Sequence, residues 1–185
     1  LNITDEAKLA GLPQYVIDLG KQTAEEAGQQ GWTYDLSYPS YGPFMRFCDD
    51  RELRRQMYVA YNSRGIGSES DNTGLVKEIV SLRLQIARLL GYESYADYAL
   101  ETRMLKTPEQ VNGFLEELLE ASLPKAKKEV KAISDYAAAH GFDGELQSWD
   151  FSYWSEKLKN EKYAVSDAEL KPYFSLDDCI DAVFG

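Results

Sequence analysis

Residues suited to metal or nucleophilic chemistry are few in this sequence. Its 185 residues include one histidine, His140, and two cysteines, Cys48 and Cys179, which form no C-x-x-C pair. A protein zinc site needs three or four ligands of the His, Cys, Asp or Glu type, and a histidine-based nucleophilic triad would depend on His140 alone. We therefore predict no catalytic and no metal-binding residue in this chain, and its substrate-binding residues stay unknown.

These three residues have simpler expected roles. His140 precedes Gly141 at the end of a predicted helix, where a partly positive ring meets the negative end of the helix dipole. Two isolated cysteines are typical of reduced core residues, because disulfide scaffolds are usually short and cysteine-dense.

Carboxylates are plentiful and could in principle carry out acid–base catalysis. That chemistry requires a cleft that shifts their pKa values, whereas carboxylates on amphipathic helices usually form a solvated face. The solvated face is the favoured interpretation for two groups: Glu116, Glu117 and Glu120; and Asp177, Asp178 and Asp181. A phosphate loop is not indicated either, since Gly65-Ile66-Gly67 lacks the preceding strand and the following lysine.

Aromatic residues are the most distinctive component, with 13 tyrosines and three tryptophans. A buried tyrosine needs a hydrogen-bond partner for its hydroxyl group, so tyrosines suit cleft walls and seams between domains as well as ordinary cores. Both interpretations stay open for the two clusters, which are Tyr38, Tyr41, Phe44 and Phe47, and then Trp149, Phe151, Tyr153, Trp154, Tyr163, Tyr173 and Phe174.

The strongest structural pattern runs from Asn72 to Met104. Apolar residues at Leu75, Ile79, Leu82, Ile86 and Leu89 are spaced four, three, four and three, which predicts one face of a helix. Gly91 suits the end of this helix, and Ser94 with Asp97 forms a capping box for the next one. With Leu82 and Ile86 in the middle of a buried stripe, replacing either by alanine would cost ~2–5 kcal/mol.

Most other segments also have helical patterns, so the predicted fold class is mainly α, a multi-helical segment with one short β-strand or small hairpin. We treat residues 1–185 as a single helical segment. Thr107-Pro108 with Gln110 is a complete helix start, and Pro124 should kink or break the long helix that follows. A short helical turn is predicted at 5–13. Helices are predicted at 13–30, 39–48, 51–62, 107–141, 149–160, 168–173 and 176–184, in addition to the two helices of the 72–104 stretch, which meet near Gly91.

One strand is predicted at Trp32–Tyr38, where bulky and polar residues alternate. A lone strand leaves its backbone groups unpaired. Its expected partner is Leu1–Thr4, or else a segment outside the chain. A strand with so little pairing would leave an edge through which chains could dimerise.

Composition excludes two classes of partner. The net charge of -11 and pI near 4.6 argue against nucleic acid and against anionic membranes, which both attract clustered Lys and Arg. No apolar run reaches the ~20 residues of a membrane span. The chain begins at Leu1 rather than Met, so we expect a processed product or an excised piece.

Five short motifs follow one another along the chain. They are Glu6–Pro13 (E-x-x-L-x-G-L-P), Leu36–Tyr41 (L-x-Y-P-x-Y), Leu82–Tyr98 (L-R-x-x-x-A-x-L-L-G-Y-x-x-x-A-D-Y), Trp149–Trp154 (W-D-x-x-Y, with Trp154 where a tyrosine is usual) and Leu170–Phe174 (L-K-x-Y-F). In order and spacing they resemble the thimet oligopeptidase family of zinc metallopeptidases over essentially the whole chain. The sequences Tyr-Pro-Ser-Tyr and Pro-Phe-Met most resemble its bacterial peptidyl-dipeptidase (dipeptidyl carboxypeptidase) branch.

The resemblance implies a parent protein that is longer, nearly all-helical and built as two lobes around a deep channel. Its zinc would be held by an H-E-x-x-H helix and a glutamate on the next helix. No H-E-x-x-H occurs here, so the resemblance implies an internal segment that precedes the catalytic domain. This segment would form part of a lobe and channel wall, contain no zinc itself, and be inactive in isolation.

The partners implied are peptide substrates for the parent protein and the rest of the parent chain packed on this segment, with no nucleic acid and no membrane. The expected compartment is the cytoplasm, with the periplasm as the alternative. The rival hypothesis is a free-standing acidic helical protein-interaction module, which the acidic, helical and aromatic-rich composition would also suit.

Overall fold

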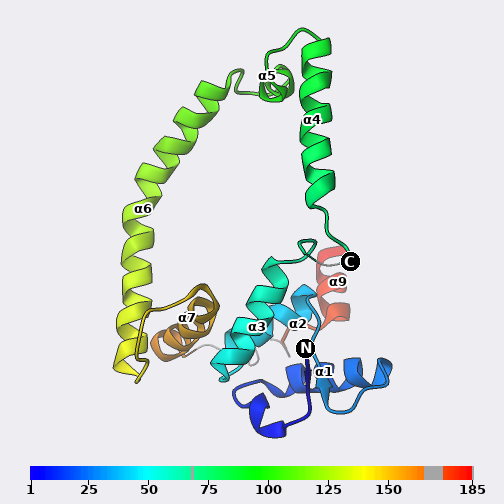
Figure 1. The fold of residues 1–185 in the computed structure, drawn as a ribbon. Coiled ribbons are helices and arrows are strands. Elements are labelled where there is room, and N and C mark those ends of the chain that lie inside the picture. Colours follow the sequence, from blue (N-terminus) through cyan, green and yellow to red (C-terminus); the bar gives the residue numbers. More distant parts are fainter. Residues whose placement is uncertain (68, 165–172, 185) are drawn as a thin grey trace. The chain divides into compact units, whose positions relative to one another are not determined.

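The structure, a computed structural model, describes residues 1–67, 69–164 and 173–184. These residues are mainly helical with one small two-stranded antiparallel sheet, which confirms the predicted fold class. The chain divides into two compact units (Figure 1), one made of Leu1–Asn62 with Ala132–Gly185 and the other of Ser63–Lys131. The helix predicted at 168–173 lies, except for Tyr173, outside the described residues.

The two-stranded antiparallel sheet of the first unit pairs β1 (Asn2–Ile3) with β2 (Trp32–Thr33). Asn2 lies opposite Thr33 and Ile3 opposite Trp32, so the expected partner segment is confirmed. The strand is shorter than predicted because Asp35 accepts hydrogen bonds from the backbone N–H of Ser37 at 3.0 Å and from its hydroxyl at 2.6 Å. This turn ends the extended backbone. Dimerisation through the strand edge stays a prediction.

The first unit contains the 3-10 turn η1 (Glu6–Leu9), α1 (Gln14–Glu26), α2 (Tyr38–Phe47), α3 (Arg51–Asn62), the last turns of α6 (Pro108–Ala139), α7 (Ser148–Tyr163) and α9 (Leu176–Phe184). The helix α2 contacts α1, α3 and α7, and α3 also contacts α7. Fully buried Val16, Tyr34, Phe44 and Cys48 belong to the main core cluster. A second cluster joins the end of α6 to α7.

The second unit contains α4 (Thr73–Leu89), α5 (Tyr95–Leu100) and α6 as far as Lys131. The predicted capping box is confirmed, because the Ser94 hydroxyl accepts from the Asp97 backbone and the Asp97 carboxylate accepts from the Ser94 backbone. The aromatic rings of Tyr92, Tyr95 and Tyr98 pack together, with centroids 5.5 and 5.9 Å apart.

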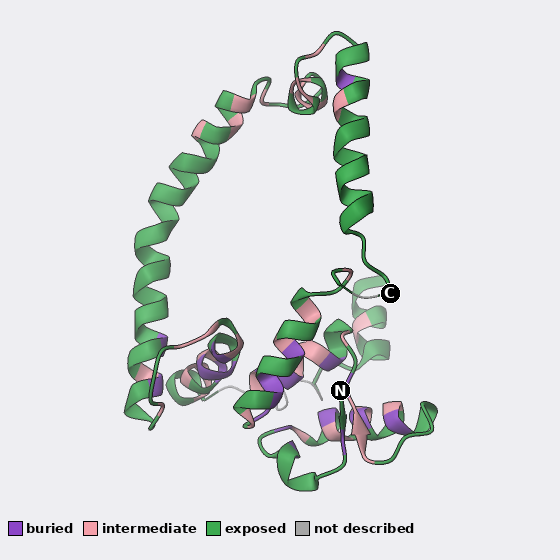
Figure 2. Cartoon of the chain, viewed as in Figure 1, coloured by how far each residue is buried: buried purple, intermediate pink, exposed green. Residues whose placement is uncertain are grey.

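The apolar side chains of the second unit are not buried (Figure 2). Leu82 is 49% and Ile86 48% exposed, and Ala87 is the one buried residue among the described positions of this unit. The prediction that Leu82 and Ile86 lie on a buried stripe is therefore wrong for this chain. The helix itself is correctly predicted, but within the described residues of the unit its apolar face from Leu75 to Ile86 stays largely exposed.

The long helix α6 continues without a break across Pro124. Proline removes one intrahelical hydrogen bond and leaves the carbonyl of Glu120 without its partner. Both residues are exposed, so water can hydrate that carbonyl and the helix does not have to end. The break that the sequence suggested is consequently not found.

Candidate functional site

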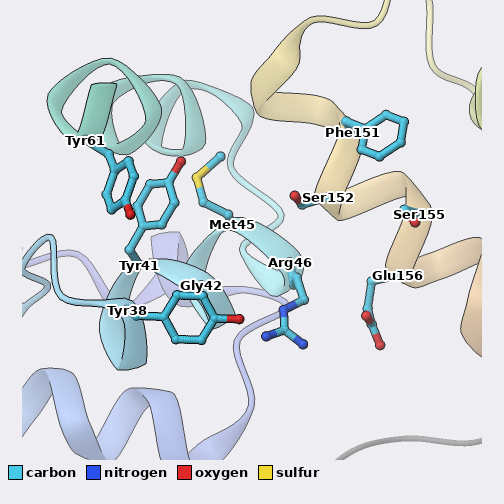
Figure 3. A pocket seen from close by; sticks show the side chains of 10 residues that line it. All are labelled: Tyr38, Tyr41, Gly42, Met45, Arg46, Tyr61, Phe151, Ser152, Ser155 and Glu156. Carbon is cyan, nitrogen blue, oxygen red and sulfur yellow. The ribbon is translucent and has the colours of Figure 1, made fainter. Parts of the chain in front are cut away.

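A groove between α2 and α7 is the candidate site of the first unit (Figure 3). Its volume is about 420 Å³, within the usual range of ~300–1,000 Å³ for ligand pockets. The lining combines aromatic rings, a thioether, the hydroxyl groups of two serines and three tyrosines, and two opposite charges. The residues are Tyr38, Tyr41, Gly42, Met45, Arg46, Tyr61, Phe151, Ser152, Ser155 and Glu156.

One wall of the groove is a single face of α2. Its five lining residues fall at spacings of three, one, three and one from Tyr38 to Arg46, which places them on the same side of a helix. The α3 residue Tyr61 extends this wall, because its ring stacks on Tyr41 with centroids 4.0 Å apart and planes at 16°. Gly42 leaves space between Tyr38 and Arg46, since a Cβ there would be 3.6 Å from the Tyr38 ring.

The opposite wall is a face of α7 formed by Phe151, Ser152, Ser155 and Glu156. Phe151 is 41% exposed, whereas Glu156 is only 7% exposed. Lys159, one turn further along α7, lies 3.3 Å from the Glu156 carboxylate. A largely buried carboxylate with a partly exposed lysine partner makes this end of the groove polar.

An ion-pair network with a buried Arg54–Asp150 pair and a half-exposed Arg51 fixes α7 against α3. Asp150 is fully buried, and its carboxylate accepts hydrogen bonds from Arg51 at 2.7 and 2.9 Å and from Arg54 at 3.1 Å. Arg54 is 2% exposed and also donates to the carbonyl groups of Cys48 and Trp149. Removing one partner would leave a buried charge uncompensated, so these contacts determine where the α7 wall of the groove lies.

The pKa of Asp150 reflects two opposing effects. Burial by itself would raise it, but hydrogen bonds from Arg51, the Gln147 backbone and Arg54 outweigh burial and hold the pKa below its usual value. The carboxylate is therefore ionised at neutral pH and acts as a charged anchor. An acid catalyst would need the opposite shift.

Tyr153 forms a second link between α7 and the start of α3. Its hydroxyl group donates to the Asp49 carboxylate at 2.7 Å, and the Arg54 guanidinium lies 4.0 Å from the centre of its ring. Burial, followed by the hydrogen bond to Asp49, raises the pKa of Tyr153. The hydroxyl thus stays protonated and serves as a structural donor.

His140 lies at the C-terminal end of α6, as the sequence predicts. Its Nδ1 is 2.8 Å from the Tyr136 carbonyl oxygen, and its Nε2 is 3.3 Å from the Glu161 carboxylate. The Tyr136 hydroxyl group donates to the same carboxylate at 2.7 Å. These contacts join the end of α6 to α7.

Both cysteines are free. Burial raises the pKa of the Cys48 thiol to about 11, so this sulfur is a poor nucleophile near neutral pH. Cys179 is half-buried on α9. Neither cysteine contributes to the groove.

The predicted carboxylate groups are exposed. Glu116, Glu117 and Glu120 face solvent on α6, and Asp177, Asp178 and Asp181 do so on α9. Within residues 1–67, 69–164 and 173–184, no three His, Cys, Asp or Glu side chains are grouped so that they could hold a metal ion.

The sequence did not single out Arg51, Arg54 or Glu156. Two arginines three residues apart on α3 and the aspartate of the W-D motif on α7 were visible in the sequence. Nothing in the sequence indicated that they contact one another. The aromatic clusters divide between the two interpretations left open, since Tyr38, Tyr41 and Phe151 line the groove while Phe44, Tyr153 and Trp154 are buried.

Among the described helices, none has the length and apolarity that crossing a bilayer requires.

Comparisons with known proteins agree with one another. The sequence model of Peptidase family M3 matches residues 44–185. Oligopeptidase A from Salmonella typhimurium (strain LT2) is 40% identical and that from Haemophilus influenzae 38% identical, each over 98% of this chain. Dipeptidyl carboxypeptidase from Escherichia coli (strain K12) is 29% identical over 98% of the chain.

The chain covers only part of these relatives. It spans 28% of the length of the two oligopeptidases and 27% of the carboxypeptidase. The identity to oligopeptidase A exceeds the identity to dipeptidyl carboxypeptidase, although the motif wording favoured the latter branch.

Proposed function

Because this chain belongs to peptidase family M3, we propose that it is a non-catalytic segment of a larger zinc-dependent peptidase that hydrolyses short peptides. The observation that carries the proposal is the family match over residues 44–185 in a chain that spans 28% of the oligopeptidases it resembles. Such a segment can belong to the enzyme without containing its reacting groups.

The zinc would be held elsewhere in the parent protein. The residues of this chain do not fit a zinc site, since the sequence has one histidine and the described positions hold no suitable group of ligands. In the parent, zinc would activate a water molecule and polarise the scissile carbonyl group. None of that chemistry is assigned to this segment.

We assign the segment a structural and substrate-confining role, as part of a lobe and channel wall. The α2–α7 groove supports this role, because it offers rings and polar groups on rigidly held helices. The second unit adds support, because Leu75 and Leu82 on α4 and Phe114 and Leu118 on α6 are 49–57% exposed. We propose that the rest of the parent chain packs on these apolar faces.

The cleavage specificity of the parent protein could be narrow, with release of C-terminal dipeptides, or broad, with cleavage within oligopeptides. The motif wording favours release of dipeptides from C-termini, the peptidyl-dipeptidase type. The higher identity to oligopeptidase A supports the broader hydrolysis of oligopeptides. Analysis of the products from a peptide of about ten residues, blocked or free at its C-terminus, separates the two forms, since removal of C-terminal dipeptides needs a free carboxylate.

The experiment compares the purified parent protein with chain 1–185. We expect the parent to retain stoichiometric zinc after dialysis and to cleave short peptides in a chelator-sensitive way, and the chain alone to do neither. Stoichiometric zinc or chelator-sensitive cleavage with chain 1–185 alone would contradict the proposal, as would a parent protein without peptidase activity.

A free-standing interaction module is the second candidate, favoured by the exposed apolar faces of α4 and α6. It predicts that chain 1–185 occurs as the mature protein in cells, whereas the peptidase proposal predicts detection only within a longer polypeptide. Immunoblotting with an antibody against the chain decides between them.

We propose that the parent protein is located in the cytoplasm. Fractionation of the same cells, followed by immunoblotting, tests this location.

A further inference from the structure

The lining of the α2–α7 groove is specific enough to indicate which part of a peptide it would contact. Tyr38, Tyr41 and Tyr61 line one side of the groove and Phe151 belongs to the α7 side, while Met45 lines it with 3% of its surface exposed. Aromatic and thioether groups present adaptable apolar surface to a ligand. Exposed Tyr38 (71%) and Phe151 (41%) leave that surface open to solvent.

The groove is also preorganised. Tyr41 is stacked on Tyr61, so the α2 wall and the end of α3 are held together. Asp150, directly before Phe151, accepts hydrogen bonds from Arg51 and Arg54, which hold this part of α7 in place. A ligand would therefore bind without paying the entropy of ordering the two walls.

Polar groups at the groove favour a ligand with little net charge. Arg46 and Glu156 both line it and carry opposite signs, so neither a polyanion nor a polycation finds a complementary surface. Ser152 and Ser155 place hydroxyl groups on the same wall, and a hydroxyl can donate to a carbonyl group or accept from an N–H. Backbone amides flanking an apolar side chain match this combination.

We propose that the α2–α7 groove is a peptide-binding subsite that takes an aromatic or large aliphatic side chain from an extended, uncharged peptide segment. The side chain lies among Tyr38, Tyr41 and Met45, and the adjoining peptide groups meet the serine hydroxyls of α7. The volume of about 420 Å³ accommodates one such side chain with its neighbouring backbone. The choice of a peptide as ligand rests on the proposed function.

The three methionines provide a site-specific assay in the full chain. Met45 lines the groove, Met57 is 1% exposed in the core of the same unit, and Met104 is 94% exposed in the other unit. The chain is prepared with methyl-labelled methionine, and its NMR methyl signals are followed as peptide is added. The probe peptide is acetyl-Gly-Phe-Gly-amide, and the comparison peptide is acetyl-Gly-Ala-Gly-amide. We expect saturable movement of the Met45 methyl signal with the Phe peptide, while Met57 and Met104 stay in place.

Two variants test the location. Gly42→Leu fills the groove without backbone strain, and its matched control is Gly113→Leu on exposed α6, where a Cβ would meet nothing within 4 Å. Tyr38→Ala removes an exposed ring, with Tyr163→Ala on α7 (61% exposed) as its control. Each groove variant should weaken binding by about fivefold or more, and neither control should change it. An unchanged Met57 signal verifies that a variant is folded.

Several results would overturn the proposal: no movement of Met45, equal movement of all three methyl signals, equal affinity for the Ala peptide, or undiminished binding by both groove variants. The assay is independent of catalysis. Peptidase activity in the parent without binding here would refute the subsite alone, whereas binding here without activity in the parent would refute the proposed function alone.

Discussion

The two units of this chain differ in where their apolar side chains lie. In the first unit, Val16, Tyr34 and Phe44 are fully buried, whereas in the second unit Leu82, Ile86 and Leu118 are about half exposed (Figure 2). Both units are built from well-formed helices. Since most helical stability in proteins comes from packing of the apolar face, we expect the first unit to fold on its own contacts, and we propose that the second packs against another segment.

The largest effect is expected at the buried ion pair of the first unit. Asp150→Ala leaves the buried Arg54 guanidinium without its carboxylate, which should cost ~3–5 kcal/mol in free energy of unfolding. Urea melts of the native sequence and the variant measure this loss in free energy of unfolding. Glu52→Gln is the matched control, because it removes an exposed carboxylate from Arg55 on the same helix and should hardly move the melt. Similar losses in both variants would contradict the importance of burial.

The same anchor predicts a pH dependence. The pKa of Asp150 is lower in the folded chain than in the unfolded chain, so its contribution is present above the unfolded value of about 3.9 and is lost as pH falls through the folded pKa. Asp150→Asn should therefore be less stable than the native sequence at pH 7, and the gap should narrow below about pH 4. A gap that is constant from pH 7 to pH 2 would exclude the linkage.

Two glycines extend the comparison to packing density. A Cβ added at Gly20 would lie 2.6 Å from the buried Tyr34 ring, so Gly20→Ala should destabilise the chain by ~1–3 kcal/mol. Gly113 on α6 has nothing within 4 Å, so Gly113→Ala should instead raise the helix stability by ~0.5–1 kcal/mol. Thermal melts followed by circular dichroism show whether each substitution lowers or raises the stability of the chain. The comparison fails if both substitutions act in the same direction.

The smallest effect is expected on the exposed face of α4. Leu82→Ala should cost under ~1 kcal/mol in chain 1–185, because the side chain is half exposed there. In the parent protein the same substitution should cost ~2–5 kcal/mol, since we propose that another part of the polypeptide covers this face. Urea melts of both proteins with and without the substitution provide the measurement. Equal costs would remove the reason for proposing a covering segment.

The sequence predicted the elements better than the contacts between them. Ser94 with Asp97, and the regular spacing from Leu75 to Leu89, are local signals, and the helices they predict are present. Burial of Leu82 could not be predicted, because amphipathic spacing shows which face needs a partner and not whether the chain contains one.

The candidate site was predictable only in part. The aromatic residues around Tyr38 and Phe151 could be recognised as either core or cleft wall, but the choice depends on how α2, α3 and α7 pack. The Arg54–Asp150 pair spans 96 residues, so no local pattern indicates it. The family likeness, in contrast, depends only on residue types in order, and it is confirmed by the match over residues 44–185.

Amide hydrogen exchange tests the central claim most directly, namely that the second unit is completed by another part of a larger peptidase. The measurement compares α4 (Thr73–Leu89) in chain 1–185 and in the parent protein, with α3 (Arg51–Asn62) of the first unit as the internal reference. We predict that α4 exchanges about a hundredfold faster in the chain alone, because its helix opens locally, while α3 is equally protected in both proteins. Equally slow exchange of α4 in both would contradict the account.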